Sequence, residues 1–138
     1  MLVGIDVLDV VRMEKFVQNE HFLEKYFTPY EIEYVSKTYR QTLSLAGIYA
    51  AKEAFLKALG IGIGGGINLN EIEVNHETNG KPYLQVVSGK AQIMLKSMNV
   101  LDIQISISHS DEMATAICIL ETSNNQKDDK NKKLFKVI

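Results

Sequence analysis

The residues with the greatest potential for chemistry lie in two segments that are far apart in the chain. Asp6 stands in the apolar segment Gly4-Ile5-Asp6-Val7, and Glu53 and Lys57 stand four residues apart in the alanine-rich segment 50–58. A carboxylate within an apolar strand is costly unless a partner satisfies it. Two carboxylates brought together would suit Mg²⁺, which takes a few carboxylates with water and substrate phosphates. With a lysine beside them to meet a phosphate oxygen, the three residues hint at a magnesium–phosphate site.

Each of these residues also has a purely structural interpretation. Asp6 can end a strand and cap the following helix, because Asp is a favoured N-cap residue. Glu53 and Lys57 share a helix face and can form a surface ion pair worth a few tenths of a kcal/mol. Two features weaken the ion-pair interpretation. Small residues surround the pair, and the helix runs into a glycine-rich loop at 60–66, which is longer than a cap requires.

The glycine-rich loop formally matches the dinucleotide-binding pattern at Gly60, Gly62 and Gly65. That pattern must follow a strand and open a helix, whereas here it follows a predicted helix and precedes a predicted strand. The sequence therefore argues against a Rossmann site. Two interpretations of the loop stay open: a flexible connection, and a loop that contacts phosphate.

Two further reactive residue types are weaker candidates. His109 lies at the end of a predicted strand within Ser106-Ile107-Ser108-His109-Ser110, where a lone histidine is more often structural, and the Gly-x-Ser-x-Gly element of a hydrolase is missing. Cys118 is the single cysteine and lies in an apolar run, as expected of a small buried hydrophobe. A chain without an internal disulfide fits a reducing cytosol, so we expect a cytoplasmic protein.

The elements that must position these residues follow from periodicity, capping and turn signals. Capping and helical spacing predict helices from about Asp9, over 28–39, over 42–59 and from a Ser88 cap to 98, while alternation predicts strands over 1–7, 70–77, 82–87, 103–108 and 114–121. Asn79-Gly80 is a strong hairpin signal between two of the strands. Strands joined by hairpins, with helices between them, indicate an α+β fold with a mainly antiparallel sheet.

Length and charge limit the domain organisation and the partners. The 138 residues suggest one domain over 1–121, followed by a polar, lysine-rich tail over 122–138. The tail carries five lysines and two aspartates, so its balance is +3 and the remainder is −5 of the net −2. A folded part of that charge is not typical of a general nucleic-acid binder. No apolar stretch reaches the roughly 20 residues of a membrane span, and no signal peptide is evident.

Taken in order, the motifs resemble those of holo-acyl-carrier-protein synthases, in the 4′-phosphopantetheinyl transferase family. The resemblance covers about residues 1–121. It is carried by Gly4-x-Asp6-Val7 with Val10 and Arg12, by Leu45-Ala46-Gly47-x-Tyr49-Ala50-Ala51-Lys52-Glu53-Ala54-x-x-Lys57-Ala58, by the glycine loop, by Asn79-Gly80-Lys81-Pro82 and by Ser106-Ile107-Ser108-His109-Ser110.

The resemblance implies an enzyme that moves the 4′-phosphopantetheine arm of coenzyme A onto a serine of apo-acyl carrier protein, with release of adenosine 3′,5′-bisphosphate. It implies Asp6 and Glu53 as Mg²⁺ ligands and Lys57 as a catalytic lysine near the pyrophosphate. The serine must lose its proton, and Glu53 or a water held by the metal is the candidate base. The remaining implied contacts are Gly80, Lys81, Pro82, His109 and Lys57 to coenzyme A, and Arg12 to the acidic carrier protein.

The resemblance also implies the family's fold with one long central helix, a homotrimer with coenzyme A between subunits, and a role in fatty acid biosynthesis and lipid metabolism. Two residues depart from the family pattern: Ile48 replaces an arginine and Ile61 replaces a threonine, which we expect to remove polar groups at the nucleotide end of the site. Two alternatives to an enzyme stay open. One is a coenzyme A-binding module of the same fold without turnover, and the other is a structural trimer with incidental carboxylates.

Overall fold

The computed structural model describes residues 1–62, 64–87 and 89–123. Its strands are β1 (Leu2–Asp9), β2 (Ile72–His76), β3 (Pro82–Val86), β4 (Val100–His109) and β5 (Met113–Thr122), and its helices are α1 (Glu20–Tyr26), α2 (Pro29–Lys37), α3 (Gln41–Ala58) and α4 (Gly89–Ser97). Two short 3₁₀ helices, η1 (Val10–Phe16) and η2 (Leu69–Glu71), complete the described elements. The Ser88 cap and the tail beyond residue 123 lie outside the described residues.

The strands form two antiparallel sheets. One sheet has the order β1-β5-β4, so the two ends of the described chain pair with each other, and the other consists of the hairpin β2-β3. The hairpin turn falls at Asn79-Gly80, as its sequence predicts. The predicted α+β class with antiparallel pairing is therefore confirmed.

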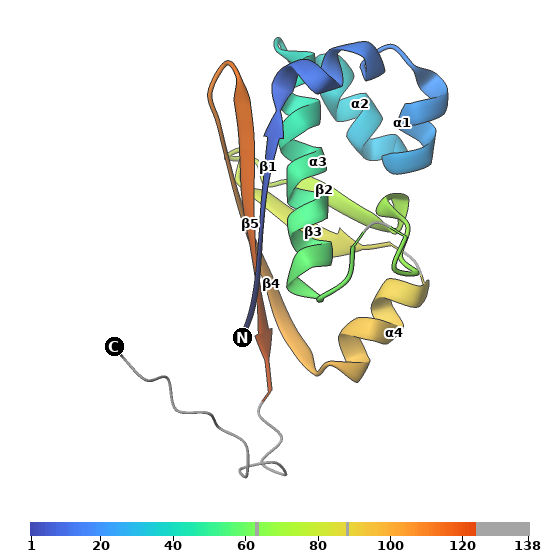
Figure 1. Cartoon of the computed structure of the whole chain (residues 1–138), viewed down its shortest axis with the longest axis vertical. Coiled ribbons are helices and arrows are strands. Elements are labelled where there is room, and N and C mark those ends of the chain that lie inside the picture. Colours follow the sequence, from blue (N-terminus) through green and yellow to red (C-terminus); the bar gives the residue numbers. More distant parts are fainter. Residues whose placement is uncertain (63, 88, 124–138) are drawn as a thin grey trace.

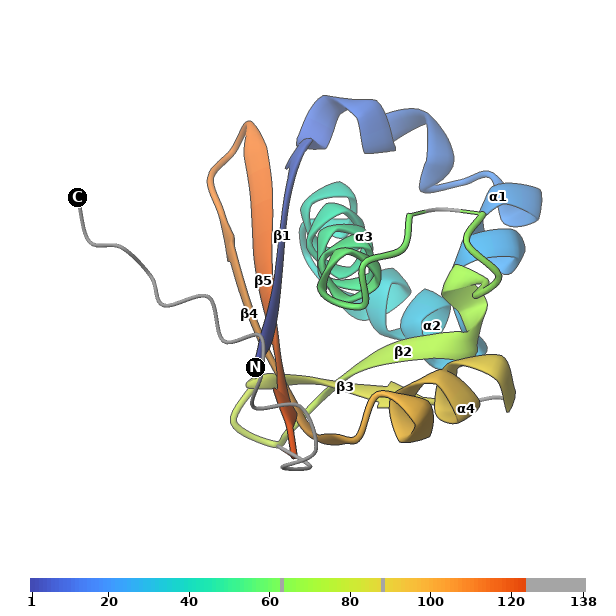
Figure 2. The same cartoon turned by 60° about the horizontal axis from the view of Figure 1, so that its bottom comes forward.

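Helix α3 is the centre of the molecule. Figures 1 and 2 show the three-stranded sheet along one side of α3, with α1, α2 and the β2-β3 hairpin on its other sides. Because neighbours surround the helix, most of its side chains are buried and many of them are small: Leu43, Leu45, Ala46, Gly47, Ile48, Ala50, Ala51, Lys52, Ala54, Phe55, Leu56 and Ala58.

Strand β1 crosses α3 at backbone-to-backbone distance. A Cβ atom on Gly4 would lie 1.9 Å from the carbonyl oxygen of Ala54 and 2.5 Å from the amide nitrogen of Ala58, so no larger residue fits there. Side chains alternate along a strand, so Asp6 points to the same side as Gly4. The glycine thereby brings the Asp6 carboxylate onto the surface of α3.

The segment between β1 and α3 differs from its predicted form. We expected one helix from Asp9, but η1 ends at Phe16 and a separate helix α1 begins at Glu20. The Asn19 side chain caps α1 by accepting a hydrogen bond from the Phe22 amide at 3.1 Å. In α2, by contrast, the predicted capping box of Thr28 and Glu31 is confirmed.

Candidate active site

Asp6 and Lys57 meet across the β1–α3 contact. Lys57 Nζ donates to Asp6 Oδ1 at 2.8 Å, from a side chain that is 52% exposed to one that is 7% exposed. Asp6 lies inside β1, opposite Ala116 of β5, and so does not cap a helix. The bond of Lys57 runs across to the strand and not along α3 to Glu53. Both structural interpretations, the cap and the ion pair along the helix, are therefore wrong.

The second oxygen of Asp6 lacks a donor. Oδ2 is buried and has no hydrogen-bond partner among the described residues. An unpaired acceptor in the interior costs about 1–3 kcal/mol, and more when it is charged. This oxygen is available to a cation.

Glu53 is a second carboxylate close to Asp6, and the positive charge around the two does not balance their negative charge. The side chain is partly buried, and its pKa is raised first by burial and then by the negative charge of Asp6, against the lowering effects of Tyr49 and Lys57. Lys57 keeps its ammonium form, since the hydrogen bond to Asp6 raises its pKa. Two neighbouring carboxylates with one exposed lysine make a negative site that favours a further cation.

Tyr49 is a site residue that sequence reasoning missed. Burial is the main cause that raises the pKa of its phenol, and the charge of Glu53 adds to it. The phenol therefore stays protonated and bonds to the Glu53 carboxylate. Tyr49 stands four residues before Glu53 on α3, so helical spacing offered the signal that would have found it.

The loop after α3 begins next to Lys57 in a defined conformation. The Ile61 amide donates to the Leu56 carbonyl and the Gly60 amide donates to the Lys57 carbonyl, each at 3.0 Å, and Gly60 has φ +78°. This pair of bonds is a Schellman motif, which glycine favours because it tolerates positive φ. The motif sets Ile61 and Gly62 against Glu53, Leu56 and Lys57, where they line a cleft of about 40 Å³. Ile61 thus lies beside Glu53 and Lys57, apart from Ile48.

A second hollow collects other predicted residues. It has a volume of about 200 Å³ and is lined by Tyr34, Leu43, Ser44, Gly47, Ile48, His76, Gly80, Pro82, Ile107 and His109. The predicted contacts Gly80, Pro82 and His109 therefore come together, and the departure Ile48 lies among them. Lys81 does not line this hollow. It lines another hollow beside β3 and β4, which Pro82 lines as well.

Sequence reasoning also missed two aromatic rings in the second hollow. The rings of Tyr34 and His76 stack with centroids 3.9 Å apart and planes 7° apart, and burial lowers the pKa of His76. A neutral imidazole stacked on a phenol offers an apolar, planar surface. No local pattern in the sequence links these two positions.

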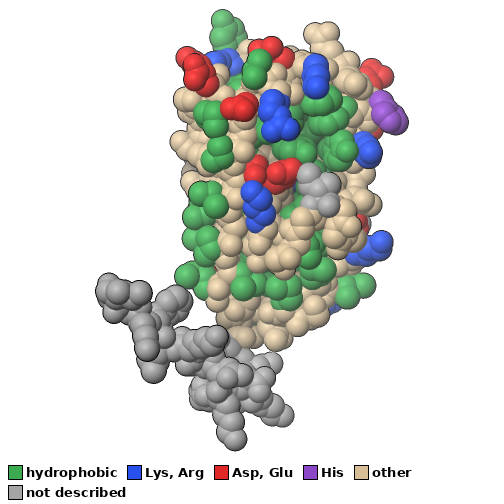
Figure 3. Space-filling model, viewed as in Figure 1, with side chains coloured by type: hydrophobic (Ala, Val, Ile, Leu, Met, Phe, Trp, Pro, Cys, Tyr) green, Lys and Arg blue, Asp and Glu red, His purple; other side chains and the backbone are tan. Residues whose placement is uncertain are grey.

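The two groups of residues lie on different sides of α3. Ile48 and Glu53 are five residues apart, which turns their side chains about 140° from each other around the helix axis. The predicted carrier contact, Arg12, is exposed on η1 and belongs to neither group. Figure 3 shows acidic and basic side chains gathered near the middle of one face, with hydrophobic side chains around them.

Comparisons with known proteins agree with this architecture. Residues 2–118 match the 4′-phosphopantetheinyl transferase superfamily. A holo-[acyl-carrier-protein] synthase of Syntrophus aciditrophicus is 43% identical over 120 residues, which is 86% of this chain and 93% of that protein.

Solved structures give the same result. The Bacillus anthracis holo-(acyl-carrier-protein) synthase in complex with CoA (3′,5′-ADP) has a TM-score of 0.72 and 35% identity, and the match covers 88% of this chain and 96% of that one. The Helicobacter pylori holo-[acyl-carrier-protein] synthase in complex with coenzyme A has a TM-score of 0.76 and 29% identity, over 87% of this chain and 100% of that one.

The chain belongs to the 4′-phosphopantetheinyl transferase superfamily, among relatives named holo-[acyl-carrier-protein] synthase. Among the described residues, no helix is both long enough and apolar enough to cross a membrane.

Proposed function

We propose that this chain transfers the 4′-phosphopantetheine group of coenzyme A to a serine of apo-acyl carrier protein and releases adenosine 3′,5′-bisphosphate. The observation that carries the proposal is the cluster of Asp6, Glu53 and Lys57, which joins two distant segments through the close contact of β1 with α3. Its relatives in sequence and structure are named for this reaction. The assignment of the individual residues rests on the geometry of the cluster.

Mg²⁺ fits the carboxylate pair. The described residues hold no group of three or more His, Cys, Asp and Glu side chains arranged for a metal. Mg²⁺ does not need one, since it is typically held by one or two carboxylates, waters and substrate phosphates. The unpaired oxygen of Asp6 and the neighbouring Glu53 match that requirement. When bound, the ion would neutralise charge on the pyrophosphate and orient it for attack.

The side chains of the cluster have distinct roles in the proposed reaction. Lys57 is half exposed and charged, so its ammonium can leave Asp6 and meet the pyrophosphate oxygen on which negative charge develops. Glu53 has a raised pKa and is the chain's own candidate to accept the proton of the attacking serine. Tyr49 holds the Glu53 carboxylate in position by its hydrogen bond.

We assign coenzyme A's nucleotide to the hollow that contains Gly80, Pro82 and His109. His109 supplies a polar contact at the end of β4, and the stacked rings of Tyr34 and His76 supply a flat apolar wall. Ile48 places an apolar side chain where the family usually has a cation, so His109 carries more of the polar recognition. Lys81 is outside this hollow, and we assign it no contact within the same chain.

The active form is proposed to be a homotrimer. The outward face of β1 exposes Val3, Ile5 and Val7 by 52%, 61% and 57%, and β5 places Ile117 and Ile119 beside them. A contiguous apolar surface of this kind marks an interaction site. The Asp6–Glu53–Lys57 cluster and the nucleotide hollow lie on different sides of α3. In the proposed trimer, the cluster of one subunit would lie next to the nucleotide hollow of its neighbour. Ile5→Lys should give monomers by light scattering, and a trimeric Ile5→Lys variant would contradict this assembly.

The proposed setting is the cytoplasm, with the carrier protein of fatty acid biosynthesis as the partner. Arg12 is exposed on η1 and available to an acidic surface. Arg12→Glu should raise KM for the carrier protein without changing KM for coenzyme A. Equal changes in both constants would argue against Arg12 as a carrier contact.

The deciding experiment is mass spectrometry of an apo-carrier protein after incubation with this chain, coenzyme A and Mg²⁺. The wild type should add the phosphopantetheine mass. Asp6→Ala and Glu53→Ala should each lower the transfer rate at least about a hundredfold. Loss of a residue that only hydrogen-bonds to a metal ligand already lowers activity roughly 10–100-fold, and loss of the ligand itself should lower it more. Glu33→Ala is the matched control, since Glu33 is an exposed carboxylate that pairs with Lys37 on α2. Binding of coenzyme A without any mass gain would favour the module without turnover.

A further inference from the structure

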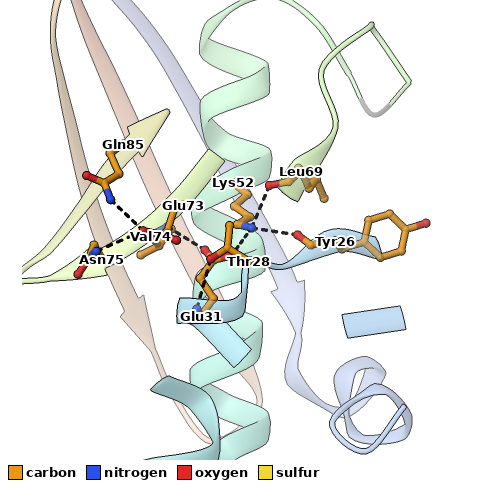
Figure 4. Close-up of polar contacts among 9 residues, drawn as sticks. All are labelled: Tyr26, Thr28, Glu31, Lys52, Leu69, Glu73, Val74, Asn75 and Gln85. Carbon is orange, nitrogen blue, oxygen red and sulfur yellow. Dashed lines mark hydrogen bonds and ion pairs between the residues drawn. The ribbon is translucent and has the colours of Figure 1, made fainter. Parts of the chain in front are cut away.

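Lys52 lies immediately before Glu53 on α3, yet its surroundings are different. Its side chain is completely buried, and its Nζ atom donates to the carbonyl oxygens of Tyr26 and Leu69 at 2.9 Å each and forms an ion pair with Glu31 (Figure 4). An ammonium group has three donors, so all of them are used. The ammonium also lies 5.0 Å from the centre of the Phe27 ring.

Glu31 is equally well satisfied. It has no exposed surface, and its two oxygens accept hydrogen bonds from the amides of Thr28 at 2.9 Å and Val74 at 2.8 Å. The Lys52–Glu31 pair therefore ties α3 to the end of α1, the start of α2, the start of η2 and β2 (Figure 4). Replacing a buried ion pair by apolar residues is often neutral or stabilising, so stability alone does not explain its presence.

One of these connections reaches the proposed active site. Leu69 begins η2, three residues after the end of the glycine-rich segment 60–66 that leaves α3 at Gly60. The Schellman motif fixes the start of this segment, and the bond from Lys52 to the Leu69 carbonyl fixes its far end. Near its start, Ile61 and Gly62 lie against Glu53 and Lys57. Both ends of the loop are thus fastened to the one helix that carries Glu53 and Lys57.

We propose that Lys52 is a positioning residue of the transferase. It fastens the end of the glycine-rich loop to α3 so that the loop's first residues stay against Glu53 and Lys57, where coenzyme A's phosphates would bind. This inference rests on the proposed function for its ligand. It adds a role for Lys52 and Glu31 that lies outside the metal pair and outside the nucleotide hollow.

The test uses the full-length protein and the double variant Glu31→Gln/Lys52→Met. The glutamine keeps an acceptor for a backbone amide and the methionine keeps the length of the side chain, while both charges are removed together. Val35→Ala is the control, because Val35 is a buried core residue of α2 that takes no part in the hydrogen bonds or the ion pair of Lys52 and Glu31. All variants are compared at a temperature where circular dichroism shows them folded.

The double variant is expected to affect the kinetic constants for coenzyme A and not those for the carrier protein. kcat/KM for coenzyme A should fall about ten- to a hundredfold in the double variant, since a small displacement of a positioning element has effects of that size. KM for the carrier protein should stay within about twofold, and Val35→Ala should lose stability without the loss in kcat/KM. A double variant with wild-type kcat/KM for coenzyme A would overturn the proposal and leave Lys52 a purely structural residue.

Two further measurements keep the outcome decisive. If the double variant does not fold, Lys52→Arg keeps both charges of the buried pair and disturbs only the geometry of its bonds, and it should still weaken coenzyme A binding several-fold. Calorimetric titration with coenzyme A and Mg²⁺ separates this inference from the proposed function. If the wild type binds coenzyme A but transfers nothing, the function fails, while equal coenzyme A affinity in wild type and Glu31→Gln/Lys52→Met would overturn the role of Lys52.

Discussion

Helix α3 carries two lysine–carboxylate clusters that differ in how completely their polar atoms are paired. In the Lys52–Glu31 cluster both side chains are fully buried and every donor and carboxylate oxygen has a partner. In the Asp6–Lys57 cluster one carboxylate oxygen is buried and unpaired, and the lysine is half exposed. A fully paired cluster has no capacity left for a ligand, whereas the second cluster is complete only when a cation or a substrate joins it.

The largest expected effect separates the two lysines by stability. Lys52→Ala leaves Glu31 as an unpaired buried charge and should lower the free energy of unfolding by about 3–5 kcal/mol. Lys57→Ala removes a half-exposed ammonium from the buried Asp6 carboxylate and should cost less, about 1–3 kcal/mol. Denaturant titration of both variants measures the difference. Similar losses would mean that the two clusters do not differ in the way described.

A second prediction concerns the contact that creates the open cluster. Gly4→Ala should cost about 1–3 kcal/mol or more, because the new methyl group would push β1 away from the backbone of α3. Asp6 would move with the strand, so transfer activity should fall as well. Gly89→Ala is the matched control, since a Cβ there meets no atom within 4 Å. Equal unfolding free energies for both alanine variants would show that the close approach is not required.

A third prediction tests whether the open cluster accepts Mg²⁺. At a concentration tenfold above its Kd, Mg²⁺ should stabilise the wild type by about 1.4 kcal/mol, and EDTA should reverse this. Asp6→Asn should remove the effect. Both oxygens of Glu31 are already paired and offer no free position to a cation, so Glu31→Gln should retain the stabilisation by Mg²⁺. A magnesium-dependent shift that persists in Asp6→Asn would place the ion elsewhere.

The smallest expected effect is at Cys118, a buried group with no charged partner. Burial raises the pKa of its thiol to about 12, so about one molecule in ten thousand would carry a thiolate at pH 8 even with free access. The native protein should not react with a thiol reagent in minutes, and denatured protein should react fully. Rapid labelling of the native state would indicate that the core around β5 opens.

Much of the candidate active site could be predicted from the sequence because its residues lie in motifs with regular spacing. Lys57 follows Glu53 by one helical turn, and Asp6 is conspicuous as a carboxylate in an apolar strand. The long helix α3 and the Asn79-Gly80 hairpin also follow from local propensity and turn chemistry. Lys81 stands in the turn before β3, and its place outside the nucleotide hollow depends on how that turn packs beside β4, which local sequence does not give.

Other features depend on contacts between distant segments. In the sequence, Lys52 is indistinguishable from an ordinary exposed lysine of a helix. Only the folded chain brings Glu31 and two carbonyl groups around it. The stacking of Tyr34 on His76 likewise joins α2 to β2. Helix α1 has only seven residues, which is too short for a clear periodic pattern.

The close approach at Gly4 also bears on the accuracy of folding. A one-residue slip of β1 against β5 would turn every side chain of the strand to the opposite face and send Asp6 outward. The same slip would bring Val3 or Ile5 to the point where α3 leaves no space for a Cβ atom. The misaligned strand is therefore rejected by steric clash, and a chain that has closed this contact has also placed its carboxylate correctly.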